Sequence, residues 1–468
     1  MRRMSRFLRT VFWLAVGLSL FPTAVNTWGE VPARDGRTSG PAASYIPWFV
    51  PMHLLVLLDS PPPAAEPDLC EGLVQDNLAH PMTPLSKPAV GQAVQDPQFG
   101  TIIRRITAVP VAEGENAVIK PVYSTIQAWN ADESYLILWH RGRGHELYDG
   151  RTYQFIRQLN LVSPTDIEQI LWDPEDPDIL YYPSNYNAVP NFYRYRVSTG
   201  VNEVVRNFGA ICPTGNWGAL LGLGSDPMYL SWAEGSRVVG LTCGDLKFLY
   251  DIKNNRVLSG ASVPGTRVAF QPAPSGQLAY GYGNVYEMAT LRLLLSLNLA
   301  SPYEHASLGR TSNGHDTLNI VVFDPPPGGS EIDHVGSLVR FDLDSGTEKV
   351  LIGMANGYPY PRSGTHISAV AHQRPNWVAV SSVGNPAGEG VLDQEISLAN
   401  AVTGKVCRIA HHRSYAGEGR WGYWAEPHVV ISPSGTRLLF GSDWGNGFSV
   451  DTYVVELPTY SPDGGNRR

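Results

Sequence analysis

The sequence predicts an all-β chain that folds as a seven-bladed β-propeller of four-stranded antiparallel blades. The 468 residues include 47 Gly and 37 Pro, and only 17% are charged, a composition typical of many short strands joined by tight turns. A turn followed by a strand rich in β-branched and aromatic residues recurs seven times between residues 100 and 460. A repeated turn-and-strand unit of this kind is typical of propellers, in which each blade buries its faces against its neighbours.

The seven copies share a turn built from Asp, Asn, Pro, Ser or Gly and an apolar strand after it. They begin at Asn130, Asp173, Ala233, Ala273, Asn313, Arg374 and Ser432. Later strands of a blade are clearest at residues 192–200, 338–346 and 395–404, where polar and apolar residues alternate and a turn glycine follows. A β-sandwich, or two smaller β-domains, is the alternative, but seven similar turns fit it poorly.

A single strand at residues 101–107 precedes the first full blade. We expect it to pair with the outer side of the last blade and so close the ring. The predicted domain organisation is therefore a propeller at residues 100–460, preceded by an arm or linker at residues 29–99 and followed by a tail at residues 461–468.

The N-terminal residues have the pattern of an export signal. Four arginines within the first nine residues precede an apolar stretch at residues 11–20, the order found in signal peptides. Residues 1–28 are predicted to be a signal peptide, and an uncleaved membrane anchor at residues 11–25 is the alternative. Either reading predicts an exported protein, periplasmic or extracellular. A second apolar stretch at residues 45–58 contains two prolines and is short for a membrane span.

Four cysteines occur without the paired spacing of a zinc ribbon. Cys212 and Cys243 fall in one predicted blade, and in an exported chain we expect them to form a disulfide; buried free thiols are the alternative. The formal net charge of −8 argues against a nucleic-acid partner.

Three histidines in the second half of the chain, His305, His366 and His428, each open a predicted inner strand. Inner strands of a propeller start at one mouth of the central channel, so these imidazoles are expected to converge. Glu426 adds a carboxylate. We predict that His366, Glu426 and His428 hold a divalent metal, because two imidazoles and one carboxylate suit Mn, Zn or Fe(II), and that His305 contacts metal or substrate. Structural histidines that bind neighbouring backbone are the alternative.

Other side chains near these strand starts are predicted to contact substrate. Tyr423 and Trp424 lead into the predicted metal site, and aromatic faces serve as stacking platforms for sugar rings. Arg310, His315 and His372 are candidates for substrate contacts and for a catalytic base. A Gly-rich turn from His140 to His145, with two arginines, is a second candidate for binding an anionic sugar, unless it is a solvated loop.

Several catalytic motifs are missing from the sequence. It contains no Gly-x-Ser-x-Gly elbow, no Walker loop, no dinucleotide-binding glycine fingerprint and no His-Glu-x-x-His helix. Serine hydrolases of the α/β type, P-loop NTPases, dinucleotide enzymes and zincins are therefore excluded.

The segment from Glu426 to Asp443 resembles the last blade of oligogalacturonate lyases, in which a His-Pro-His pattern precedes a turn and a Leu-Phe-Thr-Ser-Asp strand. It is also similar to the blades of TolB-type and WD40-like propellers. In the lyases, these histidines and one from the preceding blade help to bind a divalent metal. The resemblance places the second histidine at His428 and the preceding-blade histidine at His366, whereas Glu426 replaces the first histidine and Tyr423 replaces a glutamine.

The resemblance implies a polysaccharide lyase that acts on acidic, uronate-containing glycans. A metal at the channel mouth would neutralise the uronate carboxylate, and a basic side chain would remove the adjacent carbon-bound proton. A non-catalytic propeller that binds protein or glycan is the alternative.

Overall fold

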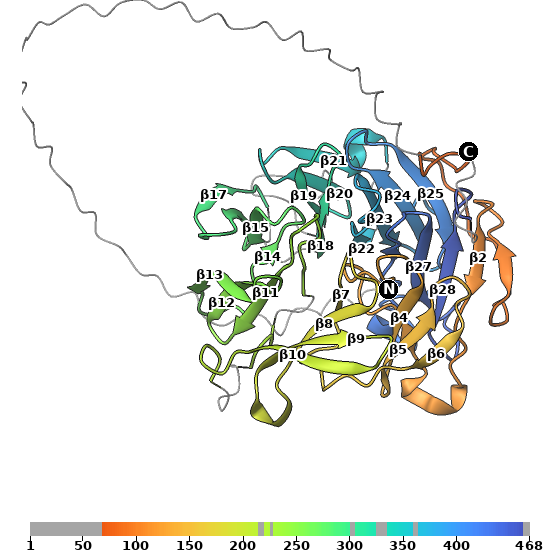
Figure 1. Cartoon of the computed structure of the whole chain (residues 1–468). Helices are drawn as coiled ribbons and strands as arrows, with labels where there is room; N and C mark the ends of the chain where they lie inside the picture. The colour runs from red at the N-terminus through yellow and green to blue at the C-terminus, as the bar shows by residue number, and fades with distance from the viewer. Residues whose placement is uncertain are drawn as a thin grey trace, which may run out of the picture. The chain divides into compact units, whose positions relative to one another are not determined.

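The computed structural model describes residues 68–213, 220–224, 228–299, 305–323, 335–358 and 364–461. These residues form seven antiparallel sheets arranged as the blades of a propeller, and Figure 1 shows the inner strands β7, β14, β18 and β22 around its centre. The predicted fold class is confirmed. The predicted signal peptide or anchor and the apolar stretch at residues 45–58 lie outside the described residues.

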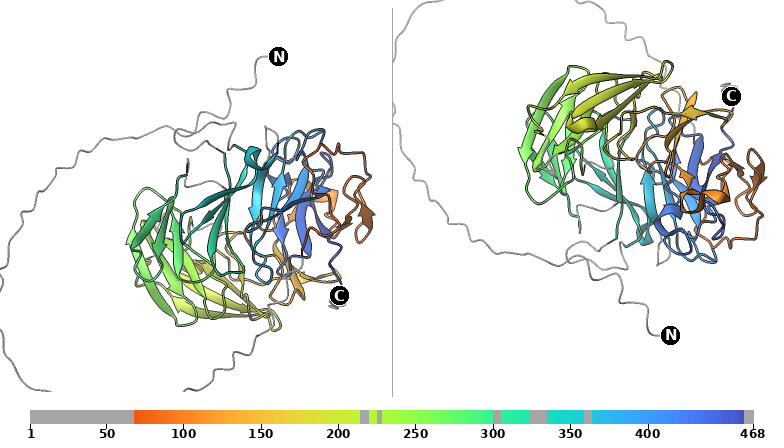
Figure 2. Two further views of the ribbon diagram at one scale, coloured as in Figure 1. Left: turned by 90° about the horizontal axis from the view of Figure 1, so that it is seen from above. Right: turned by 90° about the horizontal axis from the view of Figure 1, so that it is seen from below.

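Each blade follows the chain from the channel outward, and Figure 2 shows the blades from two further sides. Blades 1 and 2 contain β3 (Ile119–Lys120), β4 (Tyr135–His140), β5 (Gly144–Asp149), β6 (Phe155–Gln158), β7 (Leu171–Trp172), β8 (Ile179–Ser184), β9 (Asn191–Arg196) and β10 (Val201–Asn207). Blades 3 and 4 contain β11 (Val238–Cys243), β12 (Leu246–Asp251), β13 (Arg256–Ser262), β14 (Gln271–Pro272), β15 (Leu278–Gly281), β16 (Asn284–Glu287) and β17 (Leu293–Ser296). In blade 3, isolated bridges from Leu221 and Leu230 to β11 take the place of an inner strand.

Blades 5 and 6 carry two of the three histidines. They contain β18 (His305–Arg310), β19 (Asp316–Val321), β20 (Leu338–Asp342), β21 (Glu348–Ile352), β22 (Gly364–Ser368), β23 (Trp377–Ser382), β24 (Glu395–Asn400) and β25 (Val406–His411). Four short 3-10 helices complete the described residues: η1 (Val111–Asn116), η2 (Tyr186–Ala188), η3 (Met354–Asn356) and η4 (Gly422–Ala425).

Blade 7 is completed by the N-terminal part of the propeller. It contains β26 (Val430–Ile431), β27 (Arg437–Ser442) and β28 (Asp451–Glu456), and then β2 (Ile102–Arg105) and β1 (Ala93–Gln95) on its outer side. Strand β2 pairs antiparallel with β28, so that Ile102 faces Glu456. The predicted closure of the ring by this segment is confirmed.

Two disulfides tie the described residues together. The predicted bridge between Cys212 and Cys243 is confirmed, and a second bridge joins Cys70 to Cys407 across a sequence separation of 337 residues. This second bridge fastens the described part of the predicted arm, residues 68–99, to the outer strand of blade 6. The same segment runs on to blade 7, where it supplies β1.

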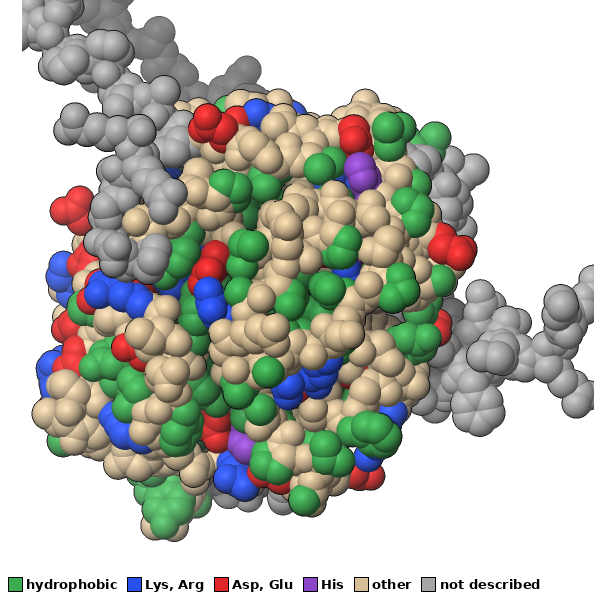
Figure 3. Space-filling model, turned by 90° about the vertical axis from the view of Figure 1, so that its right-hand side faces the viewer, with side chains coloured by type: hydrophobic (Ala, Val, Ile, Leu, Met, Phe, Trp, Pro, Cys, Tyr) green, Lys and Arg blue, Asp and Glu red, His purple; other side chains and the backbone are tan. Residues whose placement is uncertain are grey.

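The core lies between the blades, where both faces of each sheet are covered, as stacking in a ring requires. The surface is mixed: on the side of the molecule seen in Figure 3, apolar side chains alternate with charged side chains of both signs. Among the described residues, no helix has the length and apolar character needed to cross a bilayer.

Candidate metal and substrate site at the channel mouth

The structure brings the three histidines together from three consecutive blades. His305 opens β18, His366 lies near the start of β22, and His428 lies two residues before β26. The ring centroids of His305 and His366 are 4.5 Å apart, and those of His366 and His428 are 4.1 Å apart. Circular stacking of the blades therefore places side chains that are distant in sequence in one cluster.

Glu426 completes this cluster. Its Oε2 atom lies 3.7 Å from His366 Nε2 and 3.6 Å from His428 Nε2. One ligand atom from each of His366, Glu426 and His428 can be chosen so that all lie within 4.8 Å of one another. Two imidazoles and a carboxylate at this spacing form an N/O donor set that fits Mn, Fe(II) or Zn.

The hydrogen bonding of the imidazoles also fits metal ligands. Both ring nitrogens of His428 and Nδ1 of His366 are buried with no hydrogen-bond partner among the described residues. Such atoms are rare in folded proteins and call for a ligand or a solvent molecule. His305 differs, because its Nδ1 lies 2.7 Å from the carbonyl oxygen of Thr365. That bond assigns the proton to Nδ1 and leaves a lone pair on Nε2, as in many metal-binding histidines.

Burial sets the protonation of the site. It lowers the pKa of His366 and of His428 well below the ordinary value of 6.5, with smaller contributions from neighbouring cationic groups. Burial also raises the pKa of Glu426, which Lys120 partly offsets. The imidazoles are therefore neutral near pH 7, and the neutral form is the one that binds metals.

The backbone around His428 is held in an uncommon conformation. Glu426 caps the end of η4, and Pro427 follows it. His428 then has a φ of 44°, in the left-handed region that residues with a side chain seldom adopt. Strain of this kind clusters at functional sites, where the surrounding structure fixes a side chain in one direction.

A second wall of the cluster comes from blade 1 and was not predicted. Lys120 of β3 is buried, and its Nζ has no hydrogen-bond partner among the residues that the structure describes. Burial lowers its pKa from 10.5 to about 7, against the attraction of Glu426 and Glu168. The Tyr123 ring makes T-shaped contacts with both imidazoles, and its centroid is 5.4 Å from that of His366 and 4.9 Å from that of His428.

The two predicted aromatic platforms have different surroundings. The Tyr423 ring lies 5.4 Å from that of His428, and Lys120 Nζ is 5.2 Å from its centre. Tyr423 thus borders the cluster and remains partly exposed. Trp424 stacks on Trp139 at 5.1 Å, and the Arg141 guanidinium lies over its ring at 4.8 Å, so this indole fastens blade 7 to blade 1.

The other predicted residues do not join the cluster. Arg310 ends the strand that His305 opens, and six residues of extended chain put their backbones about 16 Å apart. His315 follows on that side, with Nδ1 3.1 Å from Asp342 and 3.3 Å from Asp344.

His372 lies beyond the end of β22, where its ring stacks on Trp232 at 4.8 Å. The two rings line a cavity of about 40 Å³ that residues from six blades enclose. Burial lowers the pKa of His372 to about 3, so this imidazole is neutral.

The Gly-rich turn between β4 and β5 has its histidines already engaged. His140 lies between Glu113 and Glu146, with a ring nitrogen 2.7 Å from each carboxylate. His145 places Nε2 2.8 Å from the carbonyl oxygen of Ile167. Both contacts hold neighbouring loops in place.

The fold and this cluster define a seven-bladed β-propeller with imidazole, carboxylate and amine groups at one mouth of its channel. No protein-family model matches the sequence, and no curated protein sequence is significantly similar to it.

Solved structures of similar fold include an oligogalacturonate lyase in complex with manganese, with a TM-score of 0.54 and 14% identity over 78% of this chain and 96% of that chain. An oligogalacturonate lyase from Vibrio parahaemolyticus has a TM-score of 0.53 and 10% identity, with the same coverage of 78% and 96%. The WD40 domain of Neurospora crassa Pan2 has a TM-score of 0.44 and 12% identity over 72% of this chain and 90% of that domain. At these identities the likeness shows the fold alone.

Proposed function

We propose that this protein is a metal-dependent lyase that cleaves acidic, uronate-containing glycans by β-elimination at the histidine cluster. The observation that carries the proposal is a set of buried imidazole nitrogens that lie beside a carboxylate and have no hydrogen-bond partner among the described residues. His366, Glu426 and His428 would hold the metal, and His305 would direct Nε2 toward it or toward the substrate. The manganese in the structurally similar lyase makes Mn a first candidate, alongside Zn and Fe(II).

When bound, the divalent ion would neutralise the uronate carboxylate and so make the carbon-bound proton next to it more acidic. Lys120 is the side chain that we assign to remove this proton. Its amine has no hydrogen-bond partner among the described residues, lies 5.2 Å from the centre of the Tyr423 ring and interacts electrostatically with Glu426. The C–H bond breaks as an N–H bond forms, the electron pair becomes the new C=C bond, and the glycosidic C–O bond breaks. The departing oxygen takes a proton from water.

The test is a metal analysis of the purified full chain combined with an assay for unsaturated product. We expect about one equivalent of bound metal and ultraviolet absorbance from a polyuronate. The double variant His366→Ala/His428→Ala should lose both, whereas His80→Ala, which changes a partly exposed histidine paired with Asp76, should lose neither. Metal content that survives the double replacement would contradict the proposal.

Lys120→Met separates metal binding from catalysis. It should keep the metal and lower the rate by about 10²-fold or more, the usual contribution of a general base. If no form of the protein yields unsaturated product or binds metal, the molecule is a non-catalytic propeller that binds protein or glycan.

The two disulfides support an exported location, periplasmic or extracellular, because disulfides persist in oxidising compartments. Fractionation of cells that produce the full chain tests this location. Recovery of the protein in the cytoplasm with four free thiols would count against it.

A further inference from the structure

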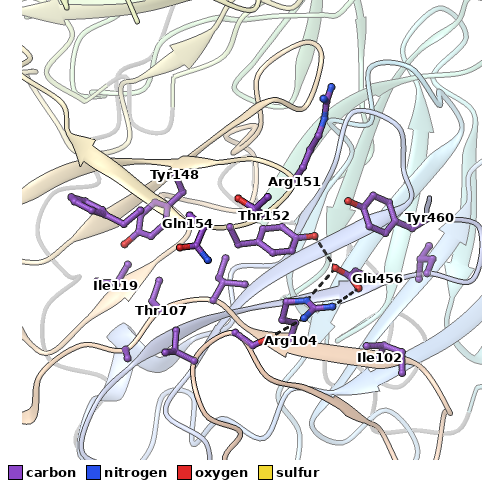
Figure 4. Close-up of a pocket in the computed structure, with 17 residues that line it drawn as sticks. Ile102, Arg104, Thr107, Ile119, Tyr148, Arg151, Thr152, Gln154, Glu456 and Tyr460 are labelled. Carbon is purple, nitrogen blue, oxygen red and sulfur yellow. Dashed lines mark hydrogen bonds and ion pairs between the residues drawn. The ribbon is translucent and has the colours of Figure 1, made fainter. Parts of the chain in front are cut away.

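A groove whose lining contains none of the three clustered histidines opens on the outer side of the propeller, between blade 7 and blade 1. Its volume is about 820 Å³, within the range of sites that hold small organic ligands. One wall comes from β2 and β28, and the other comes from β5, β6 and the turn between them. Figure 4 shows the labelled side chains of both walls around this space.

The wall from blade 7 offers side chains and no free backbone. Strand β2 is paired on both edges, with β1 and with β28, so its N–H and C=O groups are already used. Addition of a peptide strand to this wall is therefore excluded, because strand addition needs an unpaired edge. A ligand that contacts this wall is therefore recognised by its side chains.

Those side chains combine aromatic faces with planar polar groups. Four aromatic rings line the groove, those of Tyr148, Tyr153, Phe155 and Tyr460, and Phe155 is 56% exposed. Between them, Arg104 donates to both carboxylate oxygens of Glu456, at 3.3 and 3.2 Å. This mixture suits a sugar, whose ring carries apolar C–H faces and a rim of hydroxyl groups.

The floor of the groove is fixed before any ligand arrives. The Tyr153 hydroxyl donates to Glu456 at 3.1 Å, and it accepts from Arg437 at 3.3 Å. Tyr153 also has a φ of 61°, a left-handed conformation that is strained for a tyrosine. A rigid floor lowers the entropy lost on binding.

The charged residues that line the groove are two arginines, Arg104 and Arg151, and one carboxylate, Glu456. The carboxylate of Glu456 is neutralised by Arg104. Arg151, at the rim, is exposed and near the carboxylate of Asp149, and among the described residues its guanidinium donates one long hydrogen bond, of 3.5 Å, to the carbonyl oxygen of Asp132. This guanidinium is available for a carboxylate, which arginine binds through two parallel hydrogen bonds.

We propose that this groove is a second glycan-binding site, separate from the channel mouth, that holds a uronate-containing segment of a polysaccharide. Phe155 and Tyr460 provide stacking faces, and Arg151 binds the uronate carboxylate. The choice of an acidic glycan as ligand rests on the function proposed above, and the site would keep a long substrate on the enzyme between cuts.

The test is affinity electrophoresis of the full chain through gels that contain polygalacturonate, with a chelator present so that the polymer is not cleaved. The unchanged protein should be retarded by this polymer and not by a neutral glucan. Arg151→Ala/Phe155→Ala should weaken binding about tenfold or more, from the loss of one charged contact and one stacking face. The matched control is Arg292→Ala/Leu293→Ala at the start of the outer strand of blade 4. It removes an exposed arginine just before β17 and the Leu293 side chain, which is 53% exposed.

The channel-mouth variant His366→Ala/His428→Ala separates this proposal from the proposed function. It should be retarded like the unchanged protein and yet form no product. Equal retardation of the groove variant and the unchanged protein would overturn the groove proposal and leave the lyase proposal standing. Retardation by the neutral glucan to the same extent would overturn the role of Arg151. If only the groove variant loses its retardation and no form of the protein yields unsaturated product, the lyase proposal is refuted and the groove remains a glycan-binding site.

Discussion

Replacement of Lys120 by methionine should make the protein more stable at pH 7. A side chain that carries charge in water and is buried without a hydrogen-bond partner among the described residues destabilises the folded state. The pKa of Lys120 falls from 10.5 to about 7 on folding, which corresponds to about 5 kcal/mol of unfavourable free energy. Methionine has a similar length and no charge, so it removes this penalty.

The sign and the pH range follow from proton linkage. Between pH 10.5 and about 7, the unfolded chain holds the lysine proton and the folded chain does not, so the free energy of unfolding decreases as the pH falls through this range. The penalty is complete at about pH 7 and below. Above the unfolded value of 10.5 it disappears, and so should the advantage of the methionine variant.

Urea denaturation at pH 7 and at pH 10.5 measures this difference. We expect Lys120→Met to raise the free energy of unfolding by about 3 to 5 kcal/mol at pH 7 and to change it little at pH 10.5. Lys253→Met, at an exposed position of the turn after β12, is the control and should show no such pH dependence. A gain that is equal at both pH values, or a loss at pH 7, would refute the reasoning.

Three further predictions concern the disulfides, the protonation of a buried histidine and the packing of an indole ring. Replacement of Cys70 and Cys407 by serine should lower the free energy of unfolding by about 6 kcal/mol, and replacement of Cys212 and Cys243 should lower it by about 4 kcal/mol. The first loss is larger because that bridge closes a loop of 337 residues and the second closes a loop of 31. Urea denaturation of both variants tests which bridge contributes more. Burial holds the pKa of His412 at about 3, so the folded state resists protonation of this imidazole. Its contribution to the free energy of unfolding should be complete above pH 6.5 and should decrease as the pH is lowered toward 3. A urea-denaturation midpoint that stays constant over this pH range would contradict this prediction. Trp424→Ala should remove the stack on Trp139 and lower thermal stability while leaving bound metal unchanged, as melting curves and metal analysis can show.

The fold was predictable because the same local pattern occurs in every blade. Each turn and its following strand can be recognised without knowledge of distant residues, and the strand before the first blade indicated how the ring closes. The Cys70–Cys407 bridge could not be predicted in this way. It joins two segments that no local pattern relates, and their proximity depends on the path of residues 68–99 over blades 6 and 7.

The histidines of the candidate site could be predicted from the sequence because histidine is rare and recurs near the start of several inner strands. Three histidines at inner-strand starts pointed to the channel mouth, but Lys120 occupies a similar place in blade 1 and went unnoticed among other lysines. A comparison of all residues within two or three positions of each inner-strand start, whatever their type, would have found it. Arg310 and His315 were judged by nearness in sequence to His305, and an extended strand carries the chain to the opposite end of the channel instead.

The pairing of β2 with β28 has a consequence for the order of synthesis. Strand β2 emerges from the ribosome early, yet its partner follows about 350 residues later, and until then one edge has no native neighbour. Arg104 and Arg105 keep this unpaired edge hydrated, because charged residues on an edge strand disfavour pairing with the wrong strand. Their carboxylate partners, Glu456 and Asp451, belong to β28, so opposite charges favour the native pairing of β2 with β28 once that strand has been synthesised.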